Sequence, residues 1–402
     1  MKTYLDKNVY EAALERIAYC FQEFDNVLVA FSGGKDSGVL LNLCYNYADE
    51  HGLLDKLTMY HLDYEAQYQM TTEYVTRTFL EQFPGIRKMW YCVPIKAQSA
   101  CALGEPYWTP WDAAKKKLWV RAMPENPYVV HEGNLDVPFR HGMVDYEFQD
   151  KLSRHFAKKR GTTAVMVGLR ADESLNRYAA VARGKKRRSY EGRKWITQTS
   201  AVTANVYPLY DWRVSDIWTA TARFGFDYNR LYDLLYQAGL TAGQMRVASP
   251  FNDCAQESLK LYKVIDPSNW ARMIGRVNGV NFTGLYGGTT AMGWKTIKLP
   301  PGHTWKSYYE FLLSTMDART AAHYNNILEK SKRYWMQGGT VDPGTADEVL
   351  AAYPLAAVTG KSGRYDGRDI VQFMGYPDDM PVSNFRQVPS YKRMCICIMT
   401  VS

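Results

Sequence analysis

Residues 27–44 have the sequence Val-Leu-Val-Ala-Phe-Ser-Gly-Gly-Lys-Asp-Ser-Gly-Val-Leu-Leu-Asn-Leu-Cys. The apolar run Val27–Ala30 is typical of a buried strand, and the apolar residues after Gly38 are typical of a helix. Two adjacent glycines, Gly33 and Gly34, let the backbone turn sharply and bring its N–H groups against an anion. The helix adds the positive end of its dipole and its unpaired N–H donors. The stretch therefore predicts a strand, a phosphate-binding turn and a helix.

The turn also carries side chains that suit a phosphate group, because serine hydroxyls donate hydrogen bonds and the lysine brings a mobile charge. It is not a Walker P-loop, which has four residues between the first Gly and Gly-Lys, and it is not the dinucleotide G-x-G-x-x-G motif. The alternative is a glycine turn that only links strand to helix, and the sequence Ser-Gly-Gly-Lys-Asp-Ser argues against it. The predicted phosphate-binding residues are Ser32, Gly33, Gly34, Lys35, Asp36 and Ser37.

The composition is that of a globular protein with an anionic ligand. The 402 residues suffice for two or three domains, and the net charge of +8 suits a nucleotide or a nucleic acid. No run of 18 apolar residues occurs, and Met1–Tyr4 does not open a signal peptide, so we expect a cytoplasmic protein without membrane contact. Seven cysteines without a C-x-x-C pair favour a reducing compartment.

Five apolar segments predict a parallel sheet, and its strands are expected at 27–30, 56–62, 88–93, 163–167 and 201–207. Because the carboxyl ends of parallel strands face the ligand crevice, we expect Asp63 to lie near the ribose or adenine of a nucleotide. A plain capping role for Asp63 is the alternative. Residues 94–145 are rich in tryptophan and proline, which indicates an ordered insertion over the crevice. It would either recognise a second substrate or form a packed lid.

A second anion-binding element is predicted after the fourth strand, over residues 168–177. Arg170 and Arg177 lie seven residues apart, and arginine can place two N–H groups on one phosphate. Glu173 would orient an arginine or help to hold Mg²⁺. The alternative is a surface helix with salt bridges. The residues assigned to nucleotide binding here are Gly168, Arg170, Glu173, Ser174 and Arg177.

Residues 183–194 contain seven Lys or Arg side chains. Such a run is usually a solvated loop, but here it follows the predicted phosphate site closely. We expect it either to close over the nucleotide or to contact DNA or RNA. The residues assigned to nucleic acid are Lys185, Lys186, Arg187 and Arg188.

Three segments, Ser32–Ser37, Gly168–Arg177 and Pro208–Trp218, resemble in order and spacing the motifs of the phosphoadenosine-phosphosulfate (PAPS) reductases and PP-loop ATP pyrophosphatases, over about residues 25–225. The resemblance implies an α/β adenine-nucleotide alpha-hydrolase fold, a parallel five-stranded sheet with helices on both faces. It also implies that ATP, or a PAPS-like adenine nucleotide, binds with Mg²⁺. The turn would then surround the phosphates, Asp63 would lie near the nucleoside, and Arg170 and Arg177 would clamp the far phosphates.

The chain departs from the reductases in its cysteines. Those enzymes carry a catalytic cysteine in a C-terminal Glu-Cys-Gly-Leu-His segment, which is absent here. Cys395 and Cys397 alternate with apolar residues, which predicts a strand or a buried helix end in which Cys acts as a small apolar residue. Cys254, flanked by polar residues, is a candidate nucleophile. The cysteine spacing does not support an iron–sulfur cluster, and no side chain is assigned as a dedicated metal ligand.

The C-terminal half resembles a narrower branch, the PAPS-reductase-like proteins with a C-terminal domain of unknown function, among them the immunoglobulin-binding regulator A proteins. That resemblance implies a ParB/sulfiredoxin-like protein partner and a bacterial or prophage setting, with phage defence or transcriptional co-activation. The segments that carry it are 265–270, 276–279, 301–306 and 389–395. We therefore predict a nucleotide-binding domain over 1–240, with the insertion at about 94–145, and a mainly helical domain over 241–402.

Together these motifs predict an enzyme that cleaves ATP between its α- and β-phosphates and adenylates a nucleic acid or a partner protein. Lys35, Arg170 and Arg177 would offset the charge of the leaving pyrophosphate. Two alternatives remain at this stage. One is a regulatory subunit in which nucleotide binding controls a complex with a DNA-binding partner, and the other is a sulfonucleotide reductase that uses an unrecognised thiol.

Overall fold

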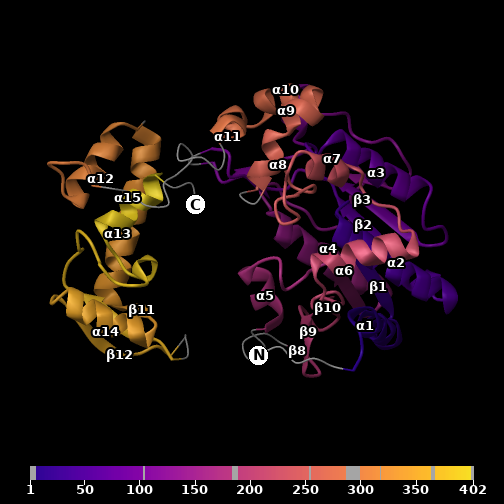
Figure 1. The fold of residues 1–402 in the computed structure, drawn as a ribbon, viewed down its shortest axis with the longest axis horizontal. Helices are drawn as coiled ribbons and strands as arrows, with labels where there is room; N and C mark the ends of the chain where they lie inside the picture. Colours follow the sequence, from indigo (N-terminus) through magenta and orange to yellow (C-terminus); the bar gives the residue numbers. More distant parts are fainter. Residues whose placement is uncertain are drawn as a thin grey trace. The chain divides into compact units, whose positions relative to one another are not determined.

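The computed structural model divides the chain into two compact units (Figure 1). The first comprises Met1–Cys101 with Glu105–Leu285, and the second comprises Ala102–Gly104 with Tyr286–Ser402. The structure describes residues 6–102, 105–182, 189–252, 255–286, 299–316, 318–363 and 367–399.

The first unit is built on an eight-stranded sheet in the order β6-β3-β2-β1-β7-β10-β9-β8. The six strands from β6 to β10 are parallel, and β9 and β8 continue the sheet as an antiparallel hairpin. The strands are β1 (Asn26–Ala30), β2 (Leu57–Leu62), β3 (Arg87–Cys92), β6 (Val129–His131), β7 (Thr163–Val167), β8 (Ser189–Tyr190), β9 (Arg193–Gln198) and β10 (Thr203–Val206).

The α/β class and the mainly parallel sheet are confirmed, but the predicted count of five strands is wrong. The expected strands are present as β1, β2, β3, β7 and β10, and three more extend the two edges. Strand β6 has three residues in the proline-rich insertion, too few to show an alternating pattern. The hairpin β8–β9 begins in the basic run, and Ile196 is its one fully buried residue, which gives too little apolar sequence to mark a strand.

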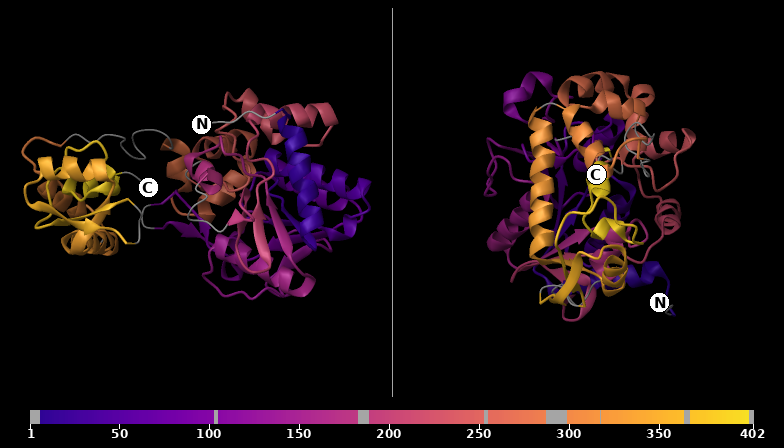
Figure 2. Two further views of the ribbon diagram at one scale, coloured as in Figure 1. Left: turned by 90° about the horizontal axis from the view of Figure 1, so that it is seen from below. Right: turned by 90° about the vertical axis from the view of Figure 1, so that its left-hand side faces the viewer.

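The sheet is covered by helices on both faces because its buried strands are apolar on both sides. Val27 and Val29 of β1 pack in a core with α1, α2, α3 and α6, whereas Leu28 faces the opposite core with α4. Figure 2 shows the strands between these helices. The helices of this unit are α1 (Val9–Glu23), α2 (Lys35–Glu50), α3 (Gln69–Leu80), α4 (Asp145–Arg160), α5 (Leu175–Ala182), α6 (Val214–Phe224), α7 (Leu231–Gln237), α8 (Gln256–Lys260), α9 (Tyr262–Ile265), α10 (Pro267–Arg276) and α11 (Val280–Tyr286).

Strand β1 lies where the order of the sheet reverses, with β2 on one side and β7 on the other. In open parallel sheets, ligands bind at such a position, outside the carboxyl ends of the strands. The turn after β1 and the segment after β7 meet there. The sheet topology therefore brings both predicted anion-binding elements to one edge.

The insertion is ordered, and a buried ion pair attaches it to this edge. Glu65, two residues beyond Asp63, accepts hydrogen bonds from the backbone N–H groups of Trp111 at 2.7 Å and Val120 at 3.0 Å. The Arg276 guanidinium, at the end of α10, binds both carboxylate oxygens of Glu65 at 2.8 and 2.9 Å, and neither side chain is more than 2% exposed. Glu65 has a φ of 63°, a left-handed conformation that these contacts stabilise.

The second unit contains helices and, in addition to the predicted helical structure, a three-stranded antiparallel sheet in the order β11-β13-β12. Cys395 lies in α15, fully buried, and its thiol donates to the carbonyl oxygen of Trp305. Burial raises the pKa of Cys395 to about 12, so this thiol behaves as an apolar side chain. The elements are α12 (Trp305–Ser314), α13 (Ala318–Gly338), β11 (Gly339–Val341), α14 (Pro343–Ala352), β12 (Ala356–Lys361), β13 (Asp369–Phe373) and α15 (Tyr391–Met399).

A search of the described helices for one with the length and apolar character needed to cross a membrane finds none.

The buried ion pair generates a stability prediction. Arg276→Met leaves the Glu65 carboxylate buried without its counter-ion, and we expect the free energy of unfolding to fall by about 3–5 kcal/mol in urea denaturation. The double variant Glu65→Gln/Arg276→Met should recover part of this loss. The matched control is Arg140→Met, which breaks the exposed ion pair with Glu147. A loss for Arg276→Met no larger than that of the control would contradict the assignment.

Candidate functional site

The turn after β1 is closed by hydrogen bonds between its own serines. The hydroxyl oxygens of Ser32 and Ser37 lie 3.0 Å apart, and the Ser32 N–H donates to the Ser37 Oγ at 3.1 Å. The Ser37 hydroxyl donates to the carbonyl oxygen of Gly34 at 3.0 Å. Gly33 has a φ of +77°, and a Cβ there would lie 3.0 Å from the Val75 side chain. The path of this loop therefore requires glycine.

Two residues from the segment before and within α7 support the loop from outside. The Lys35 N–H donates to the phenol oxygen of Tyr232 at 3.2 Å. The side-chain amide of Asn229 donates to the carbonyl oxygen of Gly33 at 3.2 Å and to the Thr71 hydroxyl at 2.9 Å. Burial raises the pKa of Tyr232 well above its ordinary value, so the phenol stays neutral. Sequence reasoning missed both residues, because no motif marks them and they lie far from the loop along the chain.

Strand β7 ends directly against the first turn of α2. A Cβ on Gly168 would lie 2.9 Å from the Ser37 backbone nitrogen and 3.0 Å from the Asp36 carbonyl carbon. Backbone atoms cannot move aside as a flexible side chain can. Only glycine allows this approach, which brings the residues after β7 to the phosphate-binding turn.

The close contact between the end of β7 and the first turn of α2 brings buried charged side chains together. The Asp36 carboxylate binds the Lys35 ammonium at 2.9 Å through one oxygen and the Arg170 Nε–H through the other. Arg170 also binds Asp172 at 2.6 Å. The side chains of Lys35 and Arg170 are 6% and 4% exposed, and Asp36 brings these two of the three predicted catalytic cations together at the turn.

The protonation state of this network follows from its charges. Burial alone would raise the pKa of Asp36, but the adjacent Lys35 and Arg170 hold it below its ordinary value. Burial would likewise lower the pKa of Arg170, and Asp36 raises it instead. Asp36 and Arg170 are therefore both charged at neutral pH.

A second pair of arginines meets at Glu173. Its carboxylate binds Arg177 at 3.0 Å and also accepts a hydrogen bond from Arg246. Ser174 accepts a hydrogen bond from the Arg177 N–H at 3.2 Å, at the start of α5. Arg246 lies beyond α7, and no sequence spacing indicated it. Glu173 thus forms ion pairs with Arg177 and Arg246, and its role in binding a nucleotide stays a prediction.

Asp63 does not join this network. It is fully buried, and the Arg121 guanidinium binds both of its oxygens, at 2.6 and 2.5 Å. The Trp90 indole N–H donates to the same carboxylate at 2.7 Å. Burial would raise the pKa of Asp63, but Arg121 lowers it below its ordinary value. Arg121 belongs to the insertion, and nothing in its local sequence marked it as the partner of Asp63.

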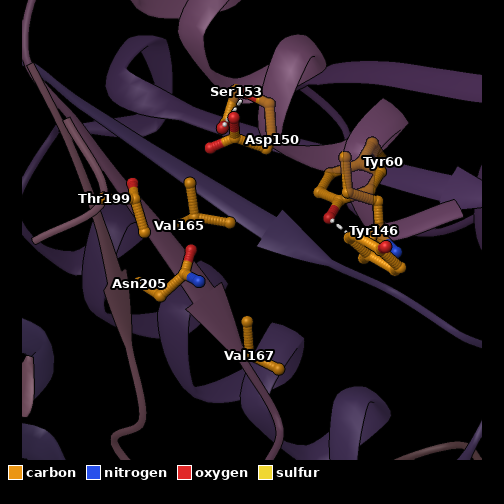
Figure 3. Close-up of a pocket in the computed structure, with 9 residues that line it drawn as sticks. Tyr60, Tyr146, Asp150, Ser153, Val165, Val167, Thr199 and Asn205 are labelled. Carbon is orange, nitrogen blue, oxygen red and sulfur yellow. Dashed lines mark hydrogen bonds between the residues drawn. The ribbon is translucent and has the colours of Figure 1, made fainter. Parts of the chain in front are cut away.

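A groove of about 180 Å³ opens on the α4 face of the sheet (Figure 3). Tyr60 and Val167 line it near the carboxyl ends of β2 and β7, and Val165 and Asn205 line it further along the sheet. The Tyr60 hydroxyl donates to the Gln149 side chain at 3.1 Å. Val167 immediately precedes Gly168, which lies against the first turn of α2.

Some predicted residues lie outside the part of the chain that the structure describes. These are Lys185, Lys186, Arg187 and Arg188 of the basic run, and Cys254. Among the described residues, no group of three or more His, Cys, Asp or Glu side chains is arranged to hold a metal ion. Asp172, 40% exposed, is a carboxylate of the kind that binds Mg²⁺ together with phosphate oxygens.

Comparison with known proteins assigns the family. The profile of the phosphoadenosine phosphosulfate reductase domain matches residues 26–238, and that of a domain of unknown function (DUF3440) matches residues 239–401. The chain belongs to the family of proteins with a phosphoadenosine phosphosulfate reductase domain, followed by a DUF3440 domain. It is similar to the protein YbdN of Escherichia coli (strain K12), with 34% identity over 353 residues that cover 87% of this chain and 85% of YbdN.

Solved structures with a similar fold are more distant. The PAPS reductase of Candida auris, in a phosphate complex, is 13% identical and aligns over 61% of this chain and 96% of its own, with a TM-score of 0.32. The U34-tRNA thiolase NcsA of Methanococcus maripaludis, with its [4Fe-4S] cluster, is 12% identical over 80% of this chain and 89% of its own, with a TM-score of 0.29. At these scores the likenesses carry no argument about activity.

The approach of β7 to α2 generates a prediction about Gly168→Ala. The added methyl group pushes the Asp36–Ser37 backbone away, and we expect the free energy of unfolding to fall by about 1–3 kcal/mol. Stabilisation by inorganic pyrophosphate, measured as a shift in Tm, should be lost as well. The control Gly344→Ala adds a methyl group in α14 with no atom within 4 Å, so it should lower neither the free energy of unfolding nor the stabilisation by pyrophosphate. Normal stabilisation of Gly168→Ala by pyrophosphate would refute this role.

The buried Asp63 carboxylate generates a pH prediction for Asp63→Asn. A lowered pKa in the folded state contributes stability that is present above the unfolded pKa and is lost as pH falls through the folded pKa. We therefore expect the variant to be less stable than wild type by about 3 kcal/mol at pH 7. The difference should shrink as pH falls below about 4, where Asp63 of the unfolded chain binds a proton, and further as pH passes through the lower pKa of the folded carboxyl. A pH-independent difference in urea denaturation would contradict this assignment.

Proposed function

We propose that the chain is an ATP-binding enzyme that cleaves ATP between the α- and β-phosphates and transfers the adenylyl group to a second substrate. The observation that carries the proposal is that several groups able to bind phosphate meet at the turn after β1. Glycine backbone, serine hydroxyls and the N-terminus of α2 meet the side chains of Lys35 and Arg170 there. Membership of the phosphoadenosine phosphosulfate reductase domain family supports an adenine nucleotide as the ligand.

The charged network gives each residue a role in this proposal. Lys35 and Arg170 bind phosphate oxygens in place of some of their hydrogen bonds to Asp36. Because Asp36 and burial already hold both side chains in position and away from water, little further ordering or desolvation is needed when the ligand binds. Arg177 and Arg246, held by Glu173, extend the positive surface toward the leaving pyrophosphate. Mg²⁺, when bound, neutralises phosphate charge, and Asp172 is the carboxylate that fits its preference for oxygen ligands.

The groove in Figure 3 suits the nucleoside. It adjoins Val167, next to the phosphate-binding turn, and its volume is close to that of a base rather than of a whole nucleotide. Val165 and Val167 provide apolar contacts, and Asn205 provides hydrogen-bonding groups for a base edge. In the reaction, a nucleophile of the second substrate forms a bond to the α-phosphorus, and pyrophosphate leaves with the electrons of the broken P–O bond.

The test is incubation of the full-length protein with α-labelled ATP and Mg²⁺, with and without DNA and candidate protein partners. We expect AMP or an adenylated product together with pyrophosphate. Lys35→Ala should reduce the rate about 100-fold, because it removes a cation that contacts the transferring phosphates. The matched control is Lys330→Ala, an exposed lysine on α13, which should react at the wild-type rate.

Other products would replace the proposal with one of two alternatives. ADP with inorganic phosphate would exclude α–β cleavage. Tight ATP binding without any product would favour a regulatory subunit that acts with a ParB/sulfiredoxin-like partner on DNA. Binding of PAPS but not ATP would favour sulfonucleotide reduction.

A further inference from the structure

A second and larger cavity lies in the insertion, away from the groove of Figure 3. Its volume is about 870 Å³, within the range of sites that hold a small organic ligand. The segment between η2 (Ala113–Leu118) and β6 forms most of its wall, and Arg272 of α10 completes it. Neither the proposed ATP site nor its network contributes a residue to this cavity.

The wall of this cavity is strongly basic. Lys116, Lys117, Arg121 and Arg272 line it, against a single acidic residue, Glu125. Within the described part of the chain, neither lysine forms an ion pair, and Arg272 contacts only the carbonyl oxygen of Val120, at 3.3 Å. Arg121 is paired with Asp63, but Lys116, Lys117 and Arg272 can attract an anionic ligand without first having to leave a carboxylate partner.

The same cavity offers a fixed aromatic surface. The Trp119 indole N–H donates to the carbonyl oxygen of Asp112 at 2.9 Å, and its ring packs edge-on against Trp111 with centroids 5.1 Å apart. Pro124 and Pro127 also line the cavity and restrict the backbone of its wall. A ring that is held in place in this way can stack on a flat ligand with little loss of conformational entropy.

We propose that this cavity binds a nucleotide unit, with its 5′-phosphate on the lysine and arginine side chains and its base against Trp119. The phosphate requires the cations, the flat base suits the tryptophan, and the volume holds one or two nucleotide units. A free nucleotide and one unit of a nucleic-acid strand share this chemistry. The inference does not depend on the reaction at the turn after β1, because the two sites share no residue.

The test measures binding of two uridine probes to the full-length protein by calorimetry: 5-iodouridine 5′-monophosphate and a short 5′-phosphorylated oligouridylate. Uridine is chosen because an adenine probe would also enter the proposed ATP site. We expect Lys116→Glu/Lys117→Glu to weaken binding at least about tenfold, since charge-assisted contacts to phosphate are lost. The matched control, Lys158→Glu/Lys330→Glu, makes the same change in net charge at exposed positions elsewhere and should bind like wild type.

Photo-crosslinking of the iodouridine probe locates the site independently of affinity. We expect the crosslink in the tryptic peptides 118–121 or 122–140, which contain Trp119 and the proline wall. Binding of both probes identifies a free nucleotide as sufficient, whereas binding of the oligouridylate alone identifies a strand, and either result supports the site.

Three results would overturn the proposal: no binding of either probe, a crosslink confined to other peptides, or equal weakening by the charge control. Lys35→Ala serves to separate the two sites. If it weakened the uridine probes as much as it weakened ATP, the probes would be bound at the turn after β1, and the cavity would not be a site of its own.

Discussion

The buried ion pair between Glu65 and Arg276 is the constraint on which the crevice edge of the first unit depends. It is enclosed on all sides, so each charge is stable there only because the other is present. The pair joins three parts of the unit: the segment after β2, which carries Glu65, the insertion, and the last turn of α10, which carries Arg276. The insertion is included because two of its backbone N–H groups donate to the Glu65 carboxylate. The same attachment places Arg121 on Asp63 and Arg272 at the insertion cavity. A substitution in this ion pair is therefore expected to disturb both the Arg121–Asp63 contact and the insertion cavity.

The turn after β1 also contains buried charges, and there one carboxylate, Asp36, compensates two cations. Lys35 and Arg170 must be buried to act on a ligand away from bulk water, yet buried cations without partners are costly. Asp36, which follows Lys35 in the motif, binds both cations and compensates their charges. In the proposed reaction, phosphate oxygens would replace carboxylate oxygens on these cations, which would therefore need little rearrangement. This preorganisation is what electrostatic catalysis of phosphate chemistry requires.

The sequence predicted what is encoded locally. The five main strands, the turn and the segment after β7 follow from apolar runs and glycine positions, and the structure brings Lys35 and Arg170 together as the motifs indicated. It did not predict contacts made by residues distant in the chain. Tyr232, Arg246 and Arg121 carry no local signal, because their roles depend on which surface the tertiary fold places beside them. The short edge strands were missed for the same reason: their pairing comes from the neighbouring strand.

The candidate site at the turn after β1 and the proposed site in the insertion cavity are built from different kinds of structure. The turn after β1 is built on the parallel sheet: β1 leads into it, α2 follows it, β7 approaches it, and Asn229 and Tyr232 support it from outside. The insertion cavity is built from irregular backbone, fixed by proline, by Trp119 and by the attachment of α10. An irregular wall can change its lining without disturbing the sheet. In our proposals, nucleotide activation therefore depends on the parallel sheet and its first helix, whereas binding of a second ligand depends on the inserted segment.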